Sequence, residues 1–138
     1  MIFNLKDFDY LREEKSVQFK EEIVDGVSLI TVCYMISNDK LWNMPLGREC
    51  RGHSFRKDTG EIVSLAYNKF FNISEKEETQ LNNINWNDDY EATSKVDGSL
   101  ITFALINNKV VCKTKKSYYS DVAILANKFL LAKIATSL

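Results

Sequence analysis

The amino-acid sequence indicates an α+β protein, made mainly of antiparallel strands with peripheral helices. Three short turn signals, Asp25-Gly26, Gly60 and Asn107-Asn108, each separate two strand-like runs. This pattern is typical of β-hairpins. Apolar residues at helical spacing lie at the two ends of the chain, outside these runs. The 138 residues, 45% of them hydrophobic, are enough for one domain with a core.

The first predicted elements are a short helix at residues 5–14 and a hairpin at residues 19–36. One face of the helix is apolar, and its residues are Leu5, Phe8 and Leu11. In the hairpin, "FKEEIVDGVSLITVCYMI", Asp25-Gly26 can supply the positive φ angles of a type I′ turn. The loop "SNDKLWNMPLG" follows.

A second hairpin and a helix are predicted next. Residues 49–66, "ECRGHSFRKDTGEIVSLA", have Gly60 at their corner. Residues 67–84, "YNKFFNISEKEETQLNNI", are expected to turn and then enter a helix capped by Asn72 or Ser74. The glutamates that follow would lie near the positive end of this helix.

The last predicted strands surround the stretch "KVDG". Residues 89–95, "DYEATSK", and 99–106, "SLITFALI", are expected to be strands on either side of it, which places Lys95 at a strand end. Two asparagines then turn the chain back into residues 109–115, "KVVCKTK".

The terminal segment 118–138 is predicted to be an amphipathic helix that packs on the core. Its apolar face consists of Val122, Leu125, Ala126, Phe129 and Ile134. If this face were left uncovered, it would favour self-association.

Charge and cysteine content exclude some kinds of site. Eighteen basic and nineteen acidic residues leave a net charge of −1, so overall charge does not indicate a nucleic-acid binder. Three distant cysteines and one histidine, His53, provide no zinc set, and no metal ligand is assigned. Cys50 and Cys112 are expected to be buried. The acidic amino-terminus and the lack of a long apolar run favour a cytoplasmic protein without a membrane span.

Basic residues nevertheless gather in one region. Lys113, Lys115 and Lys116 crowd the end of one predicted strand, and the first two share a face by the period of two. Hairpin register brings this end back toward Gly98 and Lys95. Clustered ammonium groups repel one another unless an anion joins them, so a polyphosphate is the expected guest.

Such surroundings would make Lys95 reactive. A free lysine has a pKa of about 10.4, and cationic neighbours with partial desolvation lower it. The amine could then attack the α-phosphorus of a nucleotide, while a divalent metal neutralises the phosphates. Gly98 would allow the backbone to approach the ligand, and Asp97 could brace the turn or hold metal.

Four stretches together resemble the RNA ligase 1 family of T-even bacteriophages. Residues 95–99, "KVDGS", are similar to the KxDG nucleotidyl-lysine motif of ATP-dependent ligases and capping enzymes. Residues 49–52 ("ECRG"), 69–72 ("KFFN") and 113–117 ("KTKKS") agree with the family in order and spacing. The resemblance implies a partial nucleotidyltransferase domain of the ATP-grasp-like ligase type.

The activity that the resemblance implies is RNA end-joining, as in RNA repair. Lys95 would take AMP from ATP with Mg²⁺, and the AMP would pass to an RNA 5′-phosphate end. An RNA 3′-hydroxyl would then displace the AMP and seal the strand.

The resemblance also assigns site residues by position. Lys95 is the nucleophile. The residues expected at the nucleotide are Arg51, Lys69, Ser94, Asp97, Gly98 and Lys115. Arg51 and Lys115 resemble phosphate contacts, and Ser94 would border the adenine through its backbone.

Structural alternatives stand beside these roles. Arg51 could pair with Glu49, and Lys115 could lie on an exposed strand face. Phe70 and Phe71 are expected in the core rather than in a stacking platform, and His53 is expected to be packed or on the surface.

The family pattern needs further residues: a glutamate for the ribose, an aromatic that stacks on the adenine, a metal-binding glutamate and a pair of lysines. These lie beyond the first third of a typical member, so residues 1–138 resemble the amino-terminal portion of the domain. We expect this portion to be inactive or nearly so by itself. A truncated gene product and one half of a split enzyme both stay open, as does a complementary polypeptide.

Two other functions compete with the ligase. One is a non-catalytic module that holds a nucleotide or an RNA end. The other is a DNA ligase or a GTP-using capping enzyme, against which "ECRG" and "KFFN" argue.

Overall fold

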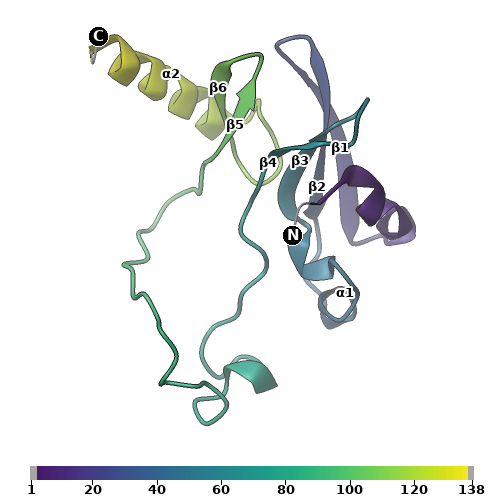
Figure 1. Ribbon diagram of the computed structural model, residues 1–138, viewed down its shortest axis with the longest axis vertical. Coiled ribbons are helices and arrows are strands. Elements are labelled where there is room, and N and C mark those ends of the chain that lie inside the picture. The colour runs from purple at the N-terminus through teal and green to yellow at the C-terminus, as the bar shows by residue number, and fades with distance from the viewer. Residues whose placement is uncertain (1–2, 137–138) are drawn as a thin grey trace.

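The computed structural model describes residues 3–136 and confirms an α+β fold (Figure 1). Within these residues the strands form a four-stranded antiparallel sheet, in the order β1-β2-β3-β4, and a separate hairpin, β5-β6. The strands are β1 (Val17–Val24), β2 (Val27–Tyr34), β3 (Arg51–Arg56), β4 (Ile62–Ser64), β5 (Thr102–Ile106) and β6 (Lys109–Lys113). The helices are η1 (Leu5–Glu13), α1 (Asp39–Trp42), η2 (Gly47–Glu49), η3 (Glu77–Thr79) and α2 (Asp121–Thr136). None of these helices is long and apolar enough to cross a membrane.

The three predicted hairpins are confirmed, and their turns have the expected backbone. Asp25 and Gly26 both have positive φ, at 48° and 79°. Asn107 and Asn108 do as well, at 48° and 62°, and Gly60 has a φ of 72° at the third corner. Two consecutive positive φ values are the signature of a type I′ turn, which follows the natural twist of the strands that it joins.

The first core lies between the four-stranded sheet and the amino-terminal helices. Asn4 caps η1 by accepting a hydrogen bond from the Lys6 amide, and Asp7 accepts one from the Asn4 amide. This helix buries Leu5, Phe8 and Leu11, as predicted. Their buried partners are Val17, Ile30, Val32, Leu41, Trp42, Cys50 and Phe55.

A second, smaller core holds the β5-β6 hairpin against the sheet. Its buried members are Val24, Leu29, Ala104, Ile106 and Tyr118. Polar contacts join the hairpin tips, because Asn107 and Lys109 both donate hydrogen bonds to Asp25. At the other end, the Ser64 hydroxyl donates to the Phe103 carbonyl oxygen. The hairpin is therefore fixed to the sheet at both ends.

The prediction of a helix within residues 67–84 is wrong. Only η3 forms there, its amino-terminal cap position is Lys76, and Ser74 has a left-handed φ of 64°. Asn72 does not cap a helix, since η3 begins five residues later, at Glu77; the Asn72 backbone amide donates to the Glu75 carboxylate. Cap residues and first-turn glutamates stabilise an existing helix. They do not replace the apolar face that holds a short helix against a core.

The strand predicted at residues 89–95 is also wrong. Residues 65–101 are irregular except for η3, and they form the wide loop that leaves β4 and returns to β5 in Figure 1. Residues 85–100 are exposed throughout. Lys95 therefore lies in this loop and not at a strand end.

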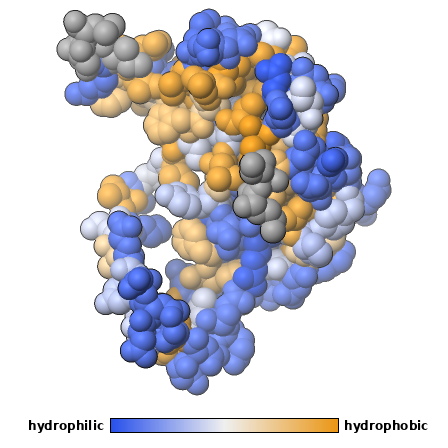
Figure 2. Space-filling view, in the orientation of Figure 1, coloured by the Kyte–Doolittle hydropathy of each residue, from blue (hydrophilic) through white to orange (hydrophobic). Residues whose placement is uncertain are grey.

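The terminal helix is confirmed as α2, but its predicted packing on the core is wrong. Among its described side chains only Ala123 is buried, while Leu125 is 67% exposed and Phe129 is 65% exposed. Figure 2 shows hydrophobic residues gathered over α2 and the β5-β6 hairpin. The side chain of Ile134 and the expected helix end at Leu138 lie outside the described residues.

Polar contacts, in place of a buried stripe, attach α2 to the hairpin. The Asn127 side chain accepts a hydrogen bond from the Cys112 amide at 2.8 Å and donates one to the Cys112 carbonyl oxygen at 3.3 Å. It thus satisfies both outward backbone groups of one residue of β6. Ser120 precedes the helix, and its hydroxyl accepts from the Ala123 amide.

Candidate functional site

A pocket of about 230 Å³ lies where the start of β3 meets the end of β6. Its lining residues are Arg51, Ala66, Tyr67, Ser99, Leu100, Thr102, Thr114 and Lys115. A wider hollow of about 530 Å³ shares four of these residues and adds Leu65, Ile101 and Phe103. The pocket thus combines two cations with hydroxyl groups and an aromatic ring.

Gly52 is the reason that Arg51 and Lys115 reach the same pocket. Its φ is +107°, and a Cβ at this position would lie only 2.5 Å from the Lys115 carbonyl oxygen. The β2-β3 register also shifts here, because His53 pairs with Val32 while Arg51 pairs with Cys33. Gly52 is therefore the extra residue of a bulge, a position where glycine permits both the φ and the close approach of a second backbone.

Lys113 and Lys115 are not equivalent, contrary to the shared face that was predicted. Lys113 is fully buried, and its Nζ donates a 2.6 Å hydrogen bond to the Gly52 carbonyl oxygen. Burial lowers the pKa of Lys113 to about 8. The Lys115 ammonium lies 3.8 Å from the centroid of the Tyr34 ring, and Lys115 is one of the residues that line the pocket. Lys113 thus supports the site from beneath, while Lys115 lines it.

Arg51 is held by two contacts from the loop that it faces. Its Nη1 donates to the Asn68 carbonyl oxygen at 2.9 Å, and its guanidinium lies 4.8 Å from the centroid of the Phe70 ring. The alternative pairing with Glu49 does not form, because the Glu49 carboxylate faces His53. A guanidinium with one bonded nitrogen keeps further donors for an anion.

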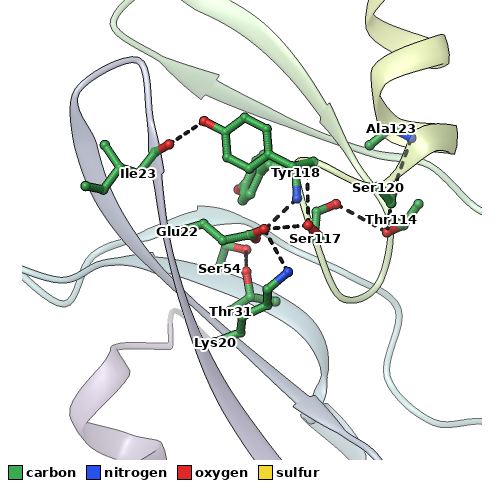
Figure 3. Close-up of polar contacts among 11 residues, drawn as sticks. Lys20, Glu22, Ile23, Thr31, Ser54, Thr114, Ser117, Tyr118, Ser120 and Ala123 are labelled. Carbon is green, nitrogen blue, oxygen red and sulfur yellow. Dashed lines mark hydrogen bonds and ion pairs between the residues drawn. The ribbon is translucent and has the colours of Figure 1, made fainter.

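The stretch "KTKKS" is anchored to β1 by one carboxylate (Figure 3). Glu22 accepts hydrogen bonds from the Ser117 hydroxyl, from the Tyr118 amide at 3.2 Å and from the Lys20 ammonium at 2.9 Å. The Glu22 side chain is only 8% exposed. These bonds fix the chain immediately after Lys115.

His53 is packed, as expected, but it also has a role that the sequence did not indicate. Its ring is fully buried, Nδ1 accepts a hydrogen bond from the Ala66 amide at 2.9 Å, and Nε2 lies 3.2 Å from a Glu49 oxygen. Burial lowers the pKa of His53, although the Glu49 carboxylate opposes this. Ala66 is part of the pocket lining.

The stretch "KFFN" lies beside the pocket rather than in it. The Lys69 ammonium donates to the Phe70 carbonyl oxygen and lies 4.3 Å from the centroid of the Phe71 ring. Phe71 packs against the first core, as predicted. Phe70 is 58% exposed, so the prediction that it lies in the core is wrong. The Arg48 backbone accepts from the Lys69 amide and so holds this segment.

The stretch "KVDGS" reaches the pocket through its last residue, Ser99. Ser94, Lys95, Asp97 and Gly98 are exposed and are not among the lining residues. Asp97 braces the turn, since its carboxylate accepts a 3.0 Å hydrogen bond from the Gly98 amide. The described residues contain no group of three or more His, Cys, Asp or Glu placed to hold a metal.

Pocket residues without a motif escaped the sequence analysis. Tyr67 and Thr102 line the pocket but lie outside the motif stretches, and Thr114 lies inside "KTKKS" but was not singled out as a site residue. The buried cysteines Cys50 and Cys112 are as predicted, and Cys33 is buried too.

Comparison with known proteins gives the family of the chain. The family model described as RNA ligase matches residues 49–137, more than half of the chain and all four motif stretches. A putative RNA ligase of Thermovibrio ammonificans is 31% identical over 90 residues, which are 65% of this chain and 23% of that protein. RNA ligase 1 of bacteriophage TS2126 is 35% identical over 51 residues, which are 37% of this chain and 13% of that protein. The matched part thus spans less than a quarter of either relative. The chain belongs to the RNA ligase family, of the bacteriophage type that its motifs resemble.

Proposed function

We propose that the chain forms part of the nucleotidyltransferase domain of an ATP-dependent RNA ligase, with Lys95 as the residue that accepts AMP. The observation that carries the proposal is the shared pocket of Arg51, Lys115 and Ser99. These residues come from three separate family stretches, "ECRG", "KTKKS" and "KVDGS". Their meeting in one pocket is what a common ligand would require.

The pocket suits the phosphates of ATP. Arg51 offers a planar fork of donors and Lys115 a compact point charge, and both favour phosphate oxygens. Ser99 adds a hydroxyl-bearing side chain to the lining, and the adjoining hollow is lined mainly by apolar side chains. A Mg²⁺ ion bound to the phosphates would neutralise their charge and that of the leaving pyrophosphate.

Lys95 is close to this pocket along the chain. It precedes Ser99 by four residues, so their Cα atoms are at most about 14 Å apart, and Ser99 lines the pocket. In the proposed step the Lys95 amine attacks the α-phosphorus of ATP. A phosphorus–nitrogen bond forms, the bond to the pyrophosphate oxygen breaks, and the amine proton passes to solvent. An RNA 5′-phosphate would then take the AMP, and an RNA 3′-hydroxyl would displace it.

The remaining parts of the site lie outside residues 1–138 under this proposal. The family resemblance requires carboxylates for ribose and metal, an aromatic for adenine and a further lysine pair. We infer that residues 1–138 supply the amino-terminal portion of the domain, with the phosphate contacts and the nucleophile. A separate polypeptide that carries the other residues would be one half of a split ligase.

A second candidate function is binding without transfer. The observation that favours it is the exposure of Lys95, which is not among the pocket residues. A chain of this kind would hold a nucleotide or a phosphorylated RNA end through Arg51 and Lys115. It would not become covalently labelled.

Anion titration tests the pocket that both candidates share. Pyrophosphate, titrated at low salt and followed by amide shifts and calorimetry, should perturb residues near Arg51 and Lys115. Affinity should fall as salt is added, because exposed charges are screened over about 8–10 Å near physiological ionic strength. The double variant Arg51→Ala/Lys115→Ala should lose binding. A matched control is Arg56→Ala/Lys57→Ala, which removes the same two charges from the other end of β3. Binding that survives the first pair would place the phosphate site elsewhere.

Labelling separates the ligase from the binding module. The chain is incubated with ATP labelled at the α-phosphate and with Mg²⁺, alone and together with the missing portion from a relative. Acid-labile label that requires the added portion and disappears in Lys95→Ala supports the ligase. Pyrophosphate binding without label in either mixture supports the binding module.

A further inference from the structure

The loop segment that follows β4 is held by side chains of β3 where backbone pairing ends. Ser54 and Ser64 form the last backbone pair between these strands. Two residues later the Ala66 amide donates to the His53 ring, and the Asn68 carbonyl oxygen accepts from Arg51. Tyr67 stands between these two bonds, 69% exposed and facing the pocket.

The bond to Ala66 depends on the protonation state of His53. Nδ1 can accept a hydrogen bond from an amide only when it carries no proton, so the ring is neutral with its hydrogen on Nε2. That hydrogen points to the Glu49 carboxylate, whose side chain is 22% exposed. The other charged group that acts on the ring is Lys113 from β6, and the rings of Phe3 and Phe8 pack beside it.

Glu49 and Lys113 affect the His53 ring in opposite directions. The carboxylate favours the imidazolium form, while burial and the Lys113 ammonium disfavour it. Because burial has the largest effect, the pKa of His53 is lowered from its ordinary value of 6.5. The Ala66 bond is therefore intact at neutral pH and is lost when acid protonates Nδ1.

We propose that neutral His53 is a positioning residue that holds Ala66 and Tyr67 as one wall of the anion pocket, and that its protonation releases this wall. The proposal rests on the pocket being the phosphate site proposed above. His53 does not touch the ligand. It acts through the Ala66 backbone, which holds Tyr67 in the lining of the pocket that Lys115 also lines.

Two isosteric substitutions separate the two ring nitrogens. His53→Asn puts an amide oxygen near the position of Nδ1 and can still accept from the Ala66 amide. His53→Gln puts its amide near the position of Nε2, so it keeps the Glu49 contact and loses the Ala66 bond. Both variants carry the same functional group in place of the buried ring, so they form a matched pair.

The direct readout is the Ala66 amide. In the wild-type chain we expect a scalar coupling between the Ala66 amide nitrogen and His53 Nδ1, together with slow hydrogen exchange at this amide. His53→Asn should retain the slow exchange, and His53→Gln should lose it. Pyrophosphate affinity should change less than about twofold in His53→Asn and fall about three- to tenfold in His53→Gln, the range that one hydrogen bond controls.

The pH profile provides a test that a purely structural residue would not pass. The Ala66 coupling and the pyrophosphate affinity of the wild-type chain should decline together as the pH falls below 6.5. Pyrophosphate itself changes charge over this range, so affinities are compared with His53→Asn at each pH. The pyrophosphate affinity of the wild-type chain, divided by that of His53→Asn at the same pH, should fall as the pH is lowered, because the asparagine does not titrate. If His53→Gln does not fold, this comparison of wild type with His53→Asn still tests whether protonation of His53 releases the wall formed by Ala66 and Tyr67.

Phe55→Leu serves as the control for lost stability, since Phe55 is another buried residue of β3 that does not line the pocket. It should lower the free energy of unfolding while leaving the Ala66 exchange slow under native conditions. Slow exchange at Ala66 in His53→Gln, or the same pH profile in wild type and His53→Asn, would overturn the proposal. If the wild-type chain binds no pyrophosphate at any pH, the proposed phosphate site fails, and the Ala66 coupling still decides whether His53 holds the wall.

Discussion

The Lys113 ammonium nitrogen lies 2.6 Å from the Gly52 carbonyl oxygen, in the interior between β6 and β3. This bond joins two of the family stretches, "KTKKS" and "ECRG", beneath the pocket. It also commits a cation to a buried position, where its charge is costly. The bond therefore has a measurable effect on how stability varies with pH.

The stability of the chain should rise with pH more steeply than that of Lys113→Met. The ordinary pKa of lysine, 10.5, applies to Lys113 in the unfolded chain, and burial in the fold lowers it to about 8. Between these two pH values the unfolded chain therefore binds more protons than the folded chain. The free energy of unfolding then increases with pH across this window. Relative to Lys113→Met, wild type should gain up to about 3 kcal/mol from pH 8 to pH 10.5. Urea denaturation at several pH values measures this, with exposed Lys116→Met as control. Parallel curves for wild type and Lys113→Met would contradict the burial of the charge.

Gly52→Ala should destabilise the chain much more than Gly26→Ala. Both glycines have positive φ, but a Cβ at Gly26 meets nothing within 4 Å, whereas at Gly52 it meets the Lys115 backbone at 2.5 Å. We expect about 1 kcal/mol for the turn glycine and about 3 kcal/mol or more for Gly52. Thermal and urea denaturation measure both. The Gly52 variant should also weaken pyrophosphate binding, since the displaced backbone is that of Lys115. Equal losses of stability in the two variants would show that the chain adjusts freely at the bulge.

Removing the Glu22 carboxylate should release the "KTKKS" turn. Glu22→Ala leaves the Ser117 hydroxyl and the Tyr118 amide without their acceptor, and Ser117 and Tyr118 are buried. A buried donor without a partner costs about 1–3 kcal/mol, so we expect a loss of about 2 kcal/mol or more. The neighbour Glu21 pairs with Lys57 on the surface and provides the control. Glu21→Ala should cost less than about 1 kcal/mol. A similar cost for the two variants would mean that the Glu22 network adds nothing to the fold.

The exposed apolar residues of α2 should drive association between chains. An α-helix with apolar residues on several sides is usually covered by a partner, and Leu125, Phe129 and Leu131 are each about two-thirds exposed. Sedimentation velocity should show a concentration-dependent increase in mass that Phe129→Lys reduces without loss of helical circular dichroism. A wild-type chain that stays monomeric at high micromolar concentration would contradict this prediction.

The hairpins could be predicted from the sequence because their signals are local. Asp25-Gly26 and Asn107-Asn108 each combine residues that tolerate positive φ with strand-like runs on both sides. The third signal, Gly60, worked for the same reason. Nothing in these predictions depended on contacts between distant parts of the chain.

The long loop could not be predicted, because its signals concern helix ends and not helix burial. Residues 67–84 offer caps and acidic residues but no apolar face, and only η3 forms there. The "DYEATSK" stretch likewise finds no strand partner among the described residues, so Lys95 lies in an open loop. A single strand has no stability without a neighbour to share its hydrogen bonds.

The pocket was only partly predictable. Arg51 and Lys115 were identified by motif, but their meeting depends on the bulge at Gly52, which is a property of two strands together. The contribution of His53 was missed because it acts through a backbone amide 13 residues away. Sequence spacing gives no sign of a contact of this kind.

Asn127 closes the outer edge of the β5-β6 hairpin at one position, Cys112. The unpaired edge of a strand normally invites the edge of another strand, and this is a common start of aggregation. Here the outward amide and carbonyl of Cys112 are already occupied by one asparagine side chain. A partner strand cannot pair with β6 at Cys112, because the backbone groups there are already bonded. A polypeptide that covers the apolar sides of α2 would therefore bind through side-chain packing and not by adding a strand to the hairpin. The Asn127 side-chain amide also fixes the position of α2 along its axis. If the helix moved by one turn, the Cys112 amide and carbonyl would both lose their hydrogen bonds to Asn127.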